Sequence, residues 1–570
     1  MRRKLKYAAA AAAGVLLLLW LFCLPHDLFE GTTYSTVVTD RNGALLGARV
    51  ADDGQWRFPP RDTLPEKFVK ALVEFEDRTF FDHCGVSPRA LVRAAIQNIR
   101  NGRIVSGGST LTMQVIRLSR QKPRTLWQKL VETCMATRLE LRCSKEEILR
   151  LYAAHAPFGG NVVGIDAARW RYLGSDRTEL SWAEAATLAV LQNAPSSIHL
   201  ARNRDQLLAK RNRLLARLHA KGEIDEEDYA LALEESLIGE PYPMPQYAPH
   251  LVEWYDRKAH GQRTVTHIDR DLQHRMEEVL VRWNRELRQK GIRDLAAIIV
   301  EVESGEPAAY CGNSDLSFDR DGKWVDIARS PRSSGSILKP LLYAAALERG
   351  TILPNSLLPD VPMDFGGFAP KNFNGSFAGA IEADQALALS LNIPNVYLLK
   401  EYGILRFVET LREAGLKTLS RPADEYGLSL ILGGAEVTLV EITACYAKMA
   451  ACYRDSTRYP SFPLHDRIAL YRTFEAMREV VRPDEMDWRR ASSAQNIAWK
   501  TGTSYGSRDA WAIGLTPKYV IGVWAGNANG SGVADLTGAR IAGPVLFELF
   551  GLLPECEWFE EPGDEEGMIR

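Results

Sequence analysis

A serine and a lysine three positions apart, Ser336 and Lys339, stand directly before an apolar helical run, 341–347. Pro340 suits the first turn of that helix, so the serine is expected at a helix start, where main-chain N–H groups help to bind an oxyanion. Apolar surroundings and a positive helix end lower the pKa of a lysine, so its neutral amine can take the serine proton. The pair predicts nucleophilic acyl transfer.

A carboxylate, Glu76, ends an apolar helical stripe that contains Val69, Leu72 and Val73. This position predicts partial desolvation, which raises the pKa of a carboxyl group toward the range of a general base at neutral pH. The alternative is a glutamate at the surface that pairs with Arg78. The residue alone therefore leaves base catalysis and a surface ion pair open.

The serine and lysine have two companions further along the chain, Ser390-Leu391-Asn392 on a helical pattern and the segment 500–503 (Lys-Thr-Gly-Thr) before a strand-like stretch. A single Ser-x-x-Lys motif is weak evidence for a family because it recurs by chance, but the three motifs in this order are specific evidence. They resemble the penicillin-binding protein and serine β-lactamase superfamily. The fold that this implies is an α/β domain with an antiparallel sheet and helices.

The resemblance implies roles for residues of these three motifs. Ser336 is the acylated nucleophile, Lys339 its base, and Ser390 a proton relay. Asn392 contacts substrate and Lys500 stabilises charge. Thr501, Gly502 and Thr503 form the substrate-binding segment, in which the two threonines bind a peptide carboxylate. The N–H groups of Ser336 and Thr503 form the oxyanion hole.

Glu76 also opens the first of several segments that resemble the signature motifs of peptidoglycan glycosyltransferases. They follow one another in the order of that family, which makes the match specific. The segments are 76–85, 107–114, 129–132, 144–152, 164–168, and 184–186 with Ala194-Pro195. The fold implied for this region is a mainly α, lysozyme-like domain.

In that family the residue matched by Glu76 deprotonates the acceptor sugar, and the one matched by Glu132 assists near the donor pyrophosphate. Two carboxylates in one cleft suit an inverting displacement. The resemblance further implies cations that face the pyrophosphate, Arg117 and Lys129, and polar contacts from Ser109 and Gln114. The sequence departs from the family pattern at 113, 128 and 153–154, which concerns rate and lipid affinity more than reaction type.

The 570 residues exceed what one hydrophobic core supports, so several units are expected. Apolar spacing of three and four predicts helices from about 64 to 237, whereas runs such as 296–300 and 519–524 look like buried strands. A strand-like hairpin is expected around 40–43. The predicted organisation is 1–25 tail and anchor, 26–60 membrane-proximal linker and hairpin, 61–240 glycosyltransferase, 241–263 linker, 264–554 transpeptidase and 555–570 acidic tail.

The segment 7–24 carries no charge and follows four basic residues, Arg2, Arg3, Lys4 and Lys6. Eighteen apolar or neutral residues barely suffice to span a membrane, and the basic residues before them place the N-terminus in the cytoplasm. A cleaved signal peptide is the alternative, although no small-x-small site follows Leu24. The sequence therefore predicts one transmembrane helix in the inner membrane, with the remaining chain in the periplasm.

Composition excludes some classes of function. Seventy basic residues nearly balance 72 acidic ones, which argues against a nucleic-acid binder. The eight cysteines form no C-x-x-C pair and no zinc spacing with histidine, so we expect neither a metal site nor another cofactor. Most cysteines, such as Cys134 and Cys445, are expected to be small buried hydrophobic residues.

The two constellations on one anchored chain resemble class A penicillin-binding proteins. The resemblance implies an enzyme that polymerises lipid II into glycan strands, cross-links stem peptides through an acyl-serine, and binds β-lactams covalently. Other envelope proteins are conceivable partners. The alternatives are a second domain that acts as a D,D-carboxypeptidase or slow β-lactamase, and a non-enzymatic envelope scaffold. A subgroup of the family, which segments 156–160, 330–335 and 390–394 resemble, usually carries a further C-terminal domain, whereas here an acidic tail follows.

Overall fold

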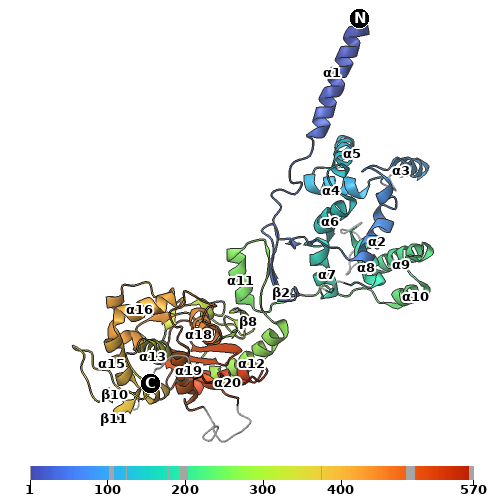
Figure 1. The fold of residues 1–570 in the computed structure, drawn as a ribbon. Helices are drawn as coiled ribbons and strands as arrows, with labels where there is room; N and C mark the ends of the chain where they lie inside the picture. The colour runs from blue at the N-terminus through green and yellow to red at the C-terminus, as the bar shows by residue number, and fades with distance from the viewer. Residues whose placement is uncertain are drawn as a thin grey trace. The chain divides into compact units, whose positions relative to one another are not determined.

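The computed structural model describes residues 2–101, 108–123, 125–175, 177, 179–192, 203–373, 375–482 and 495–563. The chain divides into two compact units, each of which is described by itself (Figure 1). The first unit comprises Met1–Thr39, Ala44–Gln246 and Val252–Thr264. The second unit comprises Asp40–Gly43, Tyr247–Leu251 and Val265–Arg570.

The first unit is mainly helical, which confirms the expectation from apolar spacing. Helix α8 is buried along almost its whole length, and α2 and α9 pack against it. Both α6 and α8 begin with a capping box, built on Ser144 and Ser181, that satisfies main-chain N–H groups at the helix start. The helices are α2 (Glu66–Glu76), α3 (Pro88–Asn101), α4 (Leu111–Arg120), α5 (Leu126–Glu140), α6 (Lys145–His155), α7 (Ile165–Leu173), α8 (Trp182–Leu191), α9 (Arg204–Ala220) and α10 (Glu226–Glu234).

Two small sheets accompany these helices. The predicted hairpin forms from β1 (Thr36–Thr39) and β2 (Leu45–Arg49), and β6 (Arg263–Val265) extends it to three strands. A second sheet, β3 (Trp56–Arg57), β5 (Val162–Val163) and β4 (Pro157–Gly159), was not predicted because its strands are only two or three residues long. The expected linker 241–263 contains a helix, α11 (Pro249–Lys258).

The second unit is built on a five-stranded antiparallel sheet in the order β13-β14-β15-β7-β8. Its strands are β7 (Asp294–Glu301), β8 (Pro307–Cys311), β13 (Ala498–Thr503), β14 (Asp509–Leu515) and β15 (Tyr519–Gly526). The mixed α/β fold predicted for this region is therefore confirmed.

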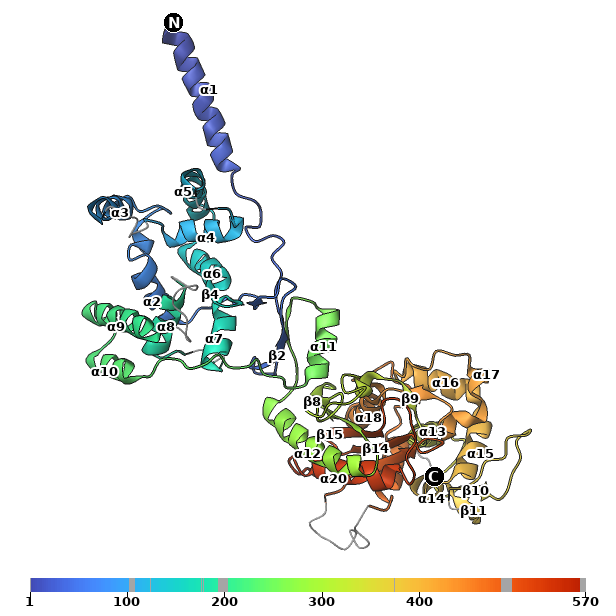
Figure 2. The ribbon, with the colours of Figure 1, turned by 180° about the vertical axis from the view of Figure 1, so that it is seen from behind.

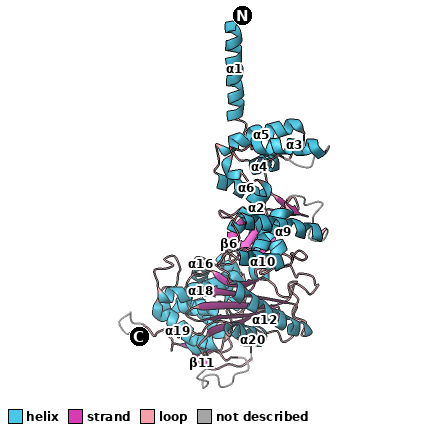
Figure 3. Ribbon diagram, turned by 90° about the vertical axis from the view of Figure 1, so that its right-hand side faces the viewer, coloured by secondary structure: helices cyan, strands magenta, loops and turns pink. Residues whose placement is uncertain are grey.

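Helices cover both faces of this sheet (Figure 3). A Cβ added at Gly514 would meet Leu546 and Phe550 of α20 (Gly543–Phe550), whereas one added at Gly522 would meet Leu439 and Thr443 of α18 (Leu439–Arg454). Helix α12 (Arg270–Gln289) packs beside α20. Strand residues therefore alternate between two apolar layers.

A helical region accompanies the sheet in the second unit (Figure 2). Helix α13 packs against α19, α14 and α15, and a short hairpin of β10 and β11 lies against α14 and α15. The elements are α13 (Lys339–Glu348), α14 (Ala383–Ala388), α15 (Asn392–Tyr402), α16 (Ile404–Glu413), α17 (Ala423–Tyr426), α19 (Arg467–Arg478), β9 (Arg332–Ser333), β10 (Leu357–Asp360), β11 (Gly379–Glu382) and β12 (Glu436–Val437).

The expected anchor falls largely on helix α1 (Arg2–Leu21). Across the described ranges, no helix combines the length and the apolar character that crossing a membrane requires.

The expectation that most cysteines are buried is wrong. Three of the eight, at 311, 445 and 452, are buried, whereas Cys84 and Cys134 are exposed. Cys134 shares an outward face of α5 with Trp127 and Leu130, which are 68% and 64% exposed. The helical spacing of these apolar residues was recognised, but the face they form points away from the core.

Candidate active sites

Ser336 lies in a turn that leads into α13, and Lys339 is the first residue of that helix. Pro340 occupies the first helical turn, as expected. The turn is fixed from outside, because Ser334 N donates to Ala435 O at 2.9 Å and Tyr446 OH donates to Ile337 O at 2.7 Å. The candidate nucleophile is therefore a half-buried residue on a turn whose other residues are buried.

The Lys339 amine is fully buried and surrounded by oxygen acceptors. Its Nζ lies 2.8 Å from Ser390 O, 3.1 Å from Leu391 O and 2.9 Å from Asn392 Oδ1. Burial, and then the nearby charge of Lys500, hold the pKa of Lys339 well below its usual value. The direction of this shift agrees with the sequence prediction, and a neighbouring cation is an additional cause.

Lys500 joins the same cluster from strand β13. Its Nζ donates to Ser390 Oγ at 2.7 Å and to Thr501 O at 2.9 Å. Burial lowers the pKa of Lys500 to about 7. Ser390, which contacts both lysines, has a left-handed backbone conformation with φ of 54°. Such a conformation at a residue other than glycine is strained and persists only where the surroundings fix it.

Strand β13 is at the edge of the sheet, and its free side faces the turn of Ser336. A Cβ on Gly335 would lie 2.7 Å from Thr503 N, and one on Gly502 would lie 3.0 Å from Ser334 O. Ser504 N donates to Asp509 O at 3.0 Å. Hydrogen-bonded and open positions alternate in an antiparallel ladder, so Thr503 N–H points away from β14, toward that turn. This is the direction that the predicted oxyanion hole requires.

The amide of Asn392 is engaged within the protein at both ends. Its Oδ1 accepts from Lys339 and its Nδ2 donates to Lys371 O at 2.8 Å. The structure thus places Asn392 against the candidate base. A contact with substrate stays a prediction for this residue.

In the first unit, Glu76 is the last residue of α2 and is half-buried. Gln114 Nε2 donates to Glu76 Oε2 at 2.8 Å, and Arg117 Nη2 donates to Gln114 Oε1 at 2.9 Å. Burial, followed by the charge of Glu76, raises the pKa of Tyr152 well above its usual value. Three residues predicted separately, on two helices, therefore form one contact chain beside a buried tyrosine.

The alternative partner of Glu76 is engaged elsewhere. Arg78 Nε lies 2.9 Å from Glu74 Oε1, and Glu74 is buried and also paired with Arg217 and Lys221. Arg78 is thus paired with Glu74, and not with Glu76 as in the alternative interpretation.

The sequence interpretation missed the residues that fix the end of α2. Asp77 Oδ2 accepts from Leu111 N at 3.1 Å, at the start of α4, and lies 2.9 Å from His83 Nε2. Gly85 N donates to His83 Nδ1 at 3.1 Å, so the proton of this ring is on Nε2. Asp77 thereby holds α2 and α4, which carry Glu76 and Gln114, against each other. The signal was available, since these residues belong to the first motif.

The other predicted residues of this unit lie on neighbouring segments. Lys129 and Glu132 are half-buried on α5, which packs against α4, and Ser109 precedes α4. Gly107 and Ala194-Pro195, which contributed to the motif matches, lie outside the described residues.

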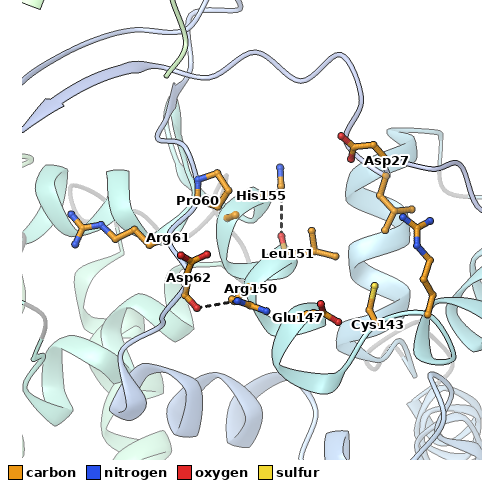
Figure 4. Close-up of a pocket in the computed structure, with 12 residues that line it drawn as sticks. Asp27, Pro60, Arg61, Asp62, Cys143, Glu147, Arg150, Leu151 and His155 are labelled. Atoms are coloured by element: carbon orange, nitrogen blue, oxygen red, sulfur yellow. Dashed lines mark hydrogen bonds between the residues drawn. The ribbon is translucent and has the colours of Figure 1, made fainter. Parts of the chain in front are cut away.

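A pocket of about 330 Å³ lies beside α6 (Figure 4). Its charged lining residues are Asp27, Asp62, Glu147, Arg61, Arg142 and Arg150. His155 also lines it, and burial lowers the pKa of this histidine to about 4. Three carboxylates balance three guanidinium groups, so the pocket has no net charge to attract a pyrophosphate. None of the predicted site residues is among the described residues that line it.

Comparison with known families decides the relationship. The transglycosylase family model matches residues 43–219, and the model of the penicillin-binding protein transpeptidase domain matches residues 295–546. Penicillin-binding protein 1C of Escherichia coli K12 is 39% identical over 523 residues, which cover 91% of this chain and 68% of that protein. The chain belongs to the class A penicillin-binding proteins. It is therefore a peptidoglycan glycosyltransferase joined to a transpeptidase.

Two further penicillin-binding proteins share less sequence identity with this chain. Penicillin-binding protein 1A of Aquifex aeolicus is 28% identical over 602 residues, covering 85% of this chain and 82% of that protein. The crystal structure of penicillin-binding protein 1A from Haemophilus influenzae is 17% identical, covers 93% of this chain and 94% of its own, and has a TM-score of 0.53. The shared fold thus persists at low identity.

Proposed function

We propose that Glu76 is the general base of glycan polymerisation. It takes the proton of the acceptor 4-hydroxyl, and the freed oxygen attacks the anomeric carbon of a lipid-linked donor from the face opposite the pyrophosphate, which leaves with the bonding electrons. Arg117 and Lys129 face the leaving charge, Glu132 assists there, and Ser109 and Gln114 supply polar contacts. The contact chain from Arg117 through Gln114 to Glu76 supports this assignment.

Ser336 is the nucleophile of the second reaction. Its Oγ attacks the carbonyl carbon of a stem peptide while Lys339 takes the hydroxyl proton, and the terminal residue leaves as an amine that regains a proton through Ser390. An acceptor amine from a second strand then attacks the ester and releases the serine. A β-lactam enters the same acylation. Lys500 stabilises charge, and Thr501, Gly502 and Thr503 bind the peptide end.

One observation carries the second assignment. Lys339 is a fully buried lysine with a strongly lowered pKa, in contact with the Ser390-Leu391-Asn392 segment and three residues after Ser336. Lowering the pKa of a buried lysine favours its neutral amine, which is the form that can take the proton of a serine.

The chain is proposed to be held at the inner membrane by 7–24, with both catalytic domains in the periplasm. The uncharged segment after four basic residues supports this. The exposed apolar side chains of Trp127 and Leu130 on α5 also suit a surface that faces lipid, where a lipid-linked donor resides. The proposed domains are 61–240 and 264–554, and their partners are lipid II, glycan strands, stem peptides and β-lactams.

Paired single variants test both sites in one preparation. Glu76→Gln is expected to stop polymerisation of labelled lipid II and to leave fluorescent-penicillin labelling intact, whereas Ser336→Ala is expected to do the reverse. The Glu76→Gln loss should be at least about a hundredfold, as for removal of a general base. Polymerisation at the wild-type rate by Glu76→Gln would refute its role, and labelling of Ser336→Ala would refute the acyl-serine.

Analysis of the reaction product distinguishes cross-linking of stem peptides from hydrolysis of the acyl-enzyme. Digestion of the product with a muramidase and mass spectrometry are expected to give dimeric muropeptides. Monomers that have only lost their terminal residue would instead establish the D,D-carboxypeptidase alternative.

A further inference from the structure

The first turn of α15 has main-chain N–H groups that need an outside acceptor. A helix start leaves such groups without intrahelical partners, and a side chain at the N-cap usually accepts from them. Here the N-cap is Leu391, whose side chain has no acceptor atom. Asn372 takes that place, because its Oδ1 accepts from Asn392 N at 3.0 Å and from Ile393 N at 3.4 Å.

Asn372 is itself held in place by a buried acid. Its Nδ2 donates to Asp360 Oδ1 at 2.7 Å and to Ser376 O at 2.9 Å, and Asp360 Oδ2 accepts from Ala378 N at 2.8 Å. Asp360 and Asn372 are 1% and 4% exposed. Main-chain N–H groups only donate and a carboxylate only accepts, so these partners determine the orientation of the Asn372 amide.

The chain of contacts ends at the candidate base. From Asp360 it passes through Asn372 to the main chain of Asn392, whose Oδ1 accepts from Lys339 Nζ at 2.9 Å. The two residues before Asn392 provide the other acceptors of this amine, through Ser390 O and Leu391 O. A shift at the start of α15 would therefore move all three oxygen atoms that surround the amine.

We propose that Asn372 is a positioning residue for acylation of Ser336, which acts by capping α15 and thereby placing Asn392 against Lys339. This rests on the proposed role of Lys339 as the base. Strand β10 ends at Asp360, which is connected to the site through Asn372. A segment outside the three sequence motifs is thus part of the acylation apparatus.

The test separates the rate constant of acylation from the amount of folded site. The full chain is mixed with a fluorescent penicillin at several concentrations, and the maximal acylation rate constant, the half-saturating concentration and the final amplitude are measured. Asn372→Ala is expected to lower the maximal rate constant about tenfold, because the start of α15 loses its acceptor and no longer fixes the oxygen atoms around the Lys339 amine. The amplitude and the half-saturating concentration should stay within about twofold of wild type.

A double variant that exchanges the amide and the carboxylate of residues 372 and 360 is designed to rescue the acylation rate. Asn372→Asp keeps an acceptor for Asn392 N but faces the Asp360 carboxylate, so it should be slow. Adding Asp360→Asn to it restores a donor and an acceptor, and the double variant should recover most of the rate constant. Asn355→Ala, an exposed asparagine before β10, is the matched control and should equal wild type.

Three results would overturn the proposal. The first is a wild-type rate constant for Asn372→Ala, and the second is a lower amplitude with an unchanged rate constant. The third applies if Asn372→Ala lowers both the amplitude and the rate constant. In that case, a double variant Asn372→Asp with Asp360→Asn that regains the amplitude but not the rate constant counts against a positioning role. Ser336→Ala and Lys339→Ala run alongside, because labelling of the first or a normal rate in the second refutes the proposed function itself.

Discussion

Lys500 Nζ and Ser390 Oγ lie 2.7 Å apart, and the lysine that donates this hydrogen bond has a pKa of about 7. In the unfolded chain the same lysine is expected near its ordinary 10.5. Between these values the unfolded state binds more protons than the folded state, so the free energy of unfolding rises with pH across this window and falls as pH drops toward 7. The lowered pKa of Lys339 acts in the same direction.

Lys500→Met is therefore expected to flatten the pH dependence of stability. Urea unfolding of the transpeptidase domain, followed between pH 7 and 10, should give a smaller increase with pH than in wild type. Lys518→Met, at an exposed position in the same domain, is the control and should keep the wild-type slope. An unchanged slope in Lys500→Met would contradict a buried lysine of low pKa.

Gly335→Ala is expected to abolish penicillin labelling while polymerisation continues. Its φ of 51° disfavours a side chain, and the added Cβ would meet Thr503 N at 2.7 Å, so the serine turn and β13 must separate. Gly350→Ala has a similar φ of 70° but open space around the Cβ, so it isolates the backbone effect of about 1 kcal/mol. Gel fluorescence on both variants measures the difference. Equal labelling would mean that this close contact is not needed.

Asp77→Ala is expected to impair the glycosyltransferase alone. It leaves Leu111 N buried without its acceptor, which costs about 1 to 3 kcal/mol, and frees α2 from α4. Polymerisation of lipid II should fall at least about tenfold and the glycosyltransferase domain should unfold at lower urea. Asp82→Ala changes an exposed acid of the same motif and should behave as wild type. Normal polymerisation by Asp77→Ala would show that Glu76 and Gln114 are positioned by other contacts.

Exposed and buried cysteines are expected to differ in their reactivity toward a maleimide at pH 7. Cys84 and Cys134 are exposed and are expected to react in the native protein. Burial raises the pKa of Cys445 to about 12 and that of Cys452 to about 11, so these two should react only after unfolding, since the thiolate is the nucleophile. Peptide mass spectrometry measures the modified fraction. Rapid native modification of Cys445 would show that α18 opens readily.

The residues of the candidate acylation site could be proposed from the sequence because their order along the chain and their types are specific. Ser336 and Lys339 are adjacent through one helical turn, so local structure brings them together. Asn372 was not predictable, since no motif marks it. Leu391 at the start of α15 does signal that the helix needs an outside acceptor, but one sequence does not say which residue outside the helix supplies it. The sequence shows that the start of α15 needs a hydrogen-bond acceptor, and the tertiary fold determines which residue supplies it.

In the sheet and in the glycosyltransferase helices, too, local sequence patterns predicted elements but not their tertiary contacts. Strand-like runs identified β7 and β15, but their direct pairing, Ile299 with Ile521, joins segments more than two hundred positions apart and depends on the whole fold. Apolar spacing likewise predicted helix α5 but not which side its apolar face points to. Trp127 and Leu130 on that face are exposed. A spacing rule reports which residues share a face, not what that face meets.

The buried hydrophobic cluster around α8 and the one around the five-stranded sheet have no residue in common. The first cluster belongs to the first compact unit and the other to the second, so we expect two cooperative melting transitions. Calorimetry should record two heat-absorption peaks, and a covalent β-lactam should move only the peak of the domain that it acylates. A variant's thermal shift has meaning only after its peak has been assigned.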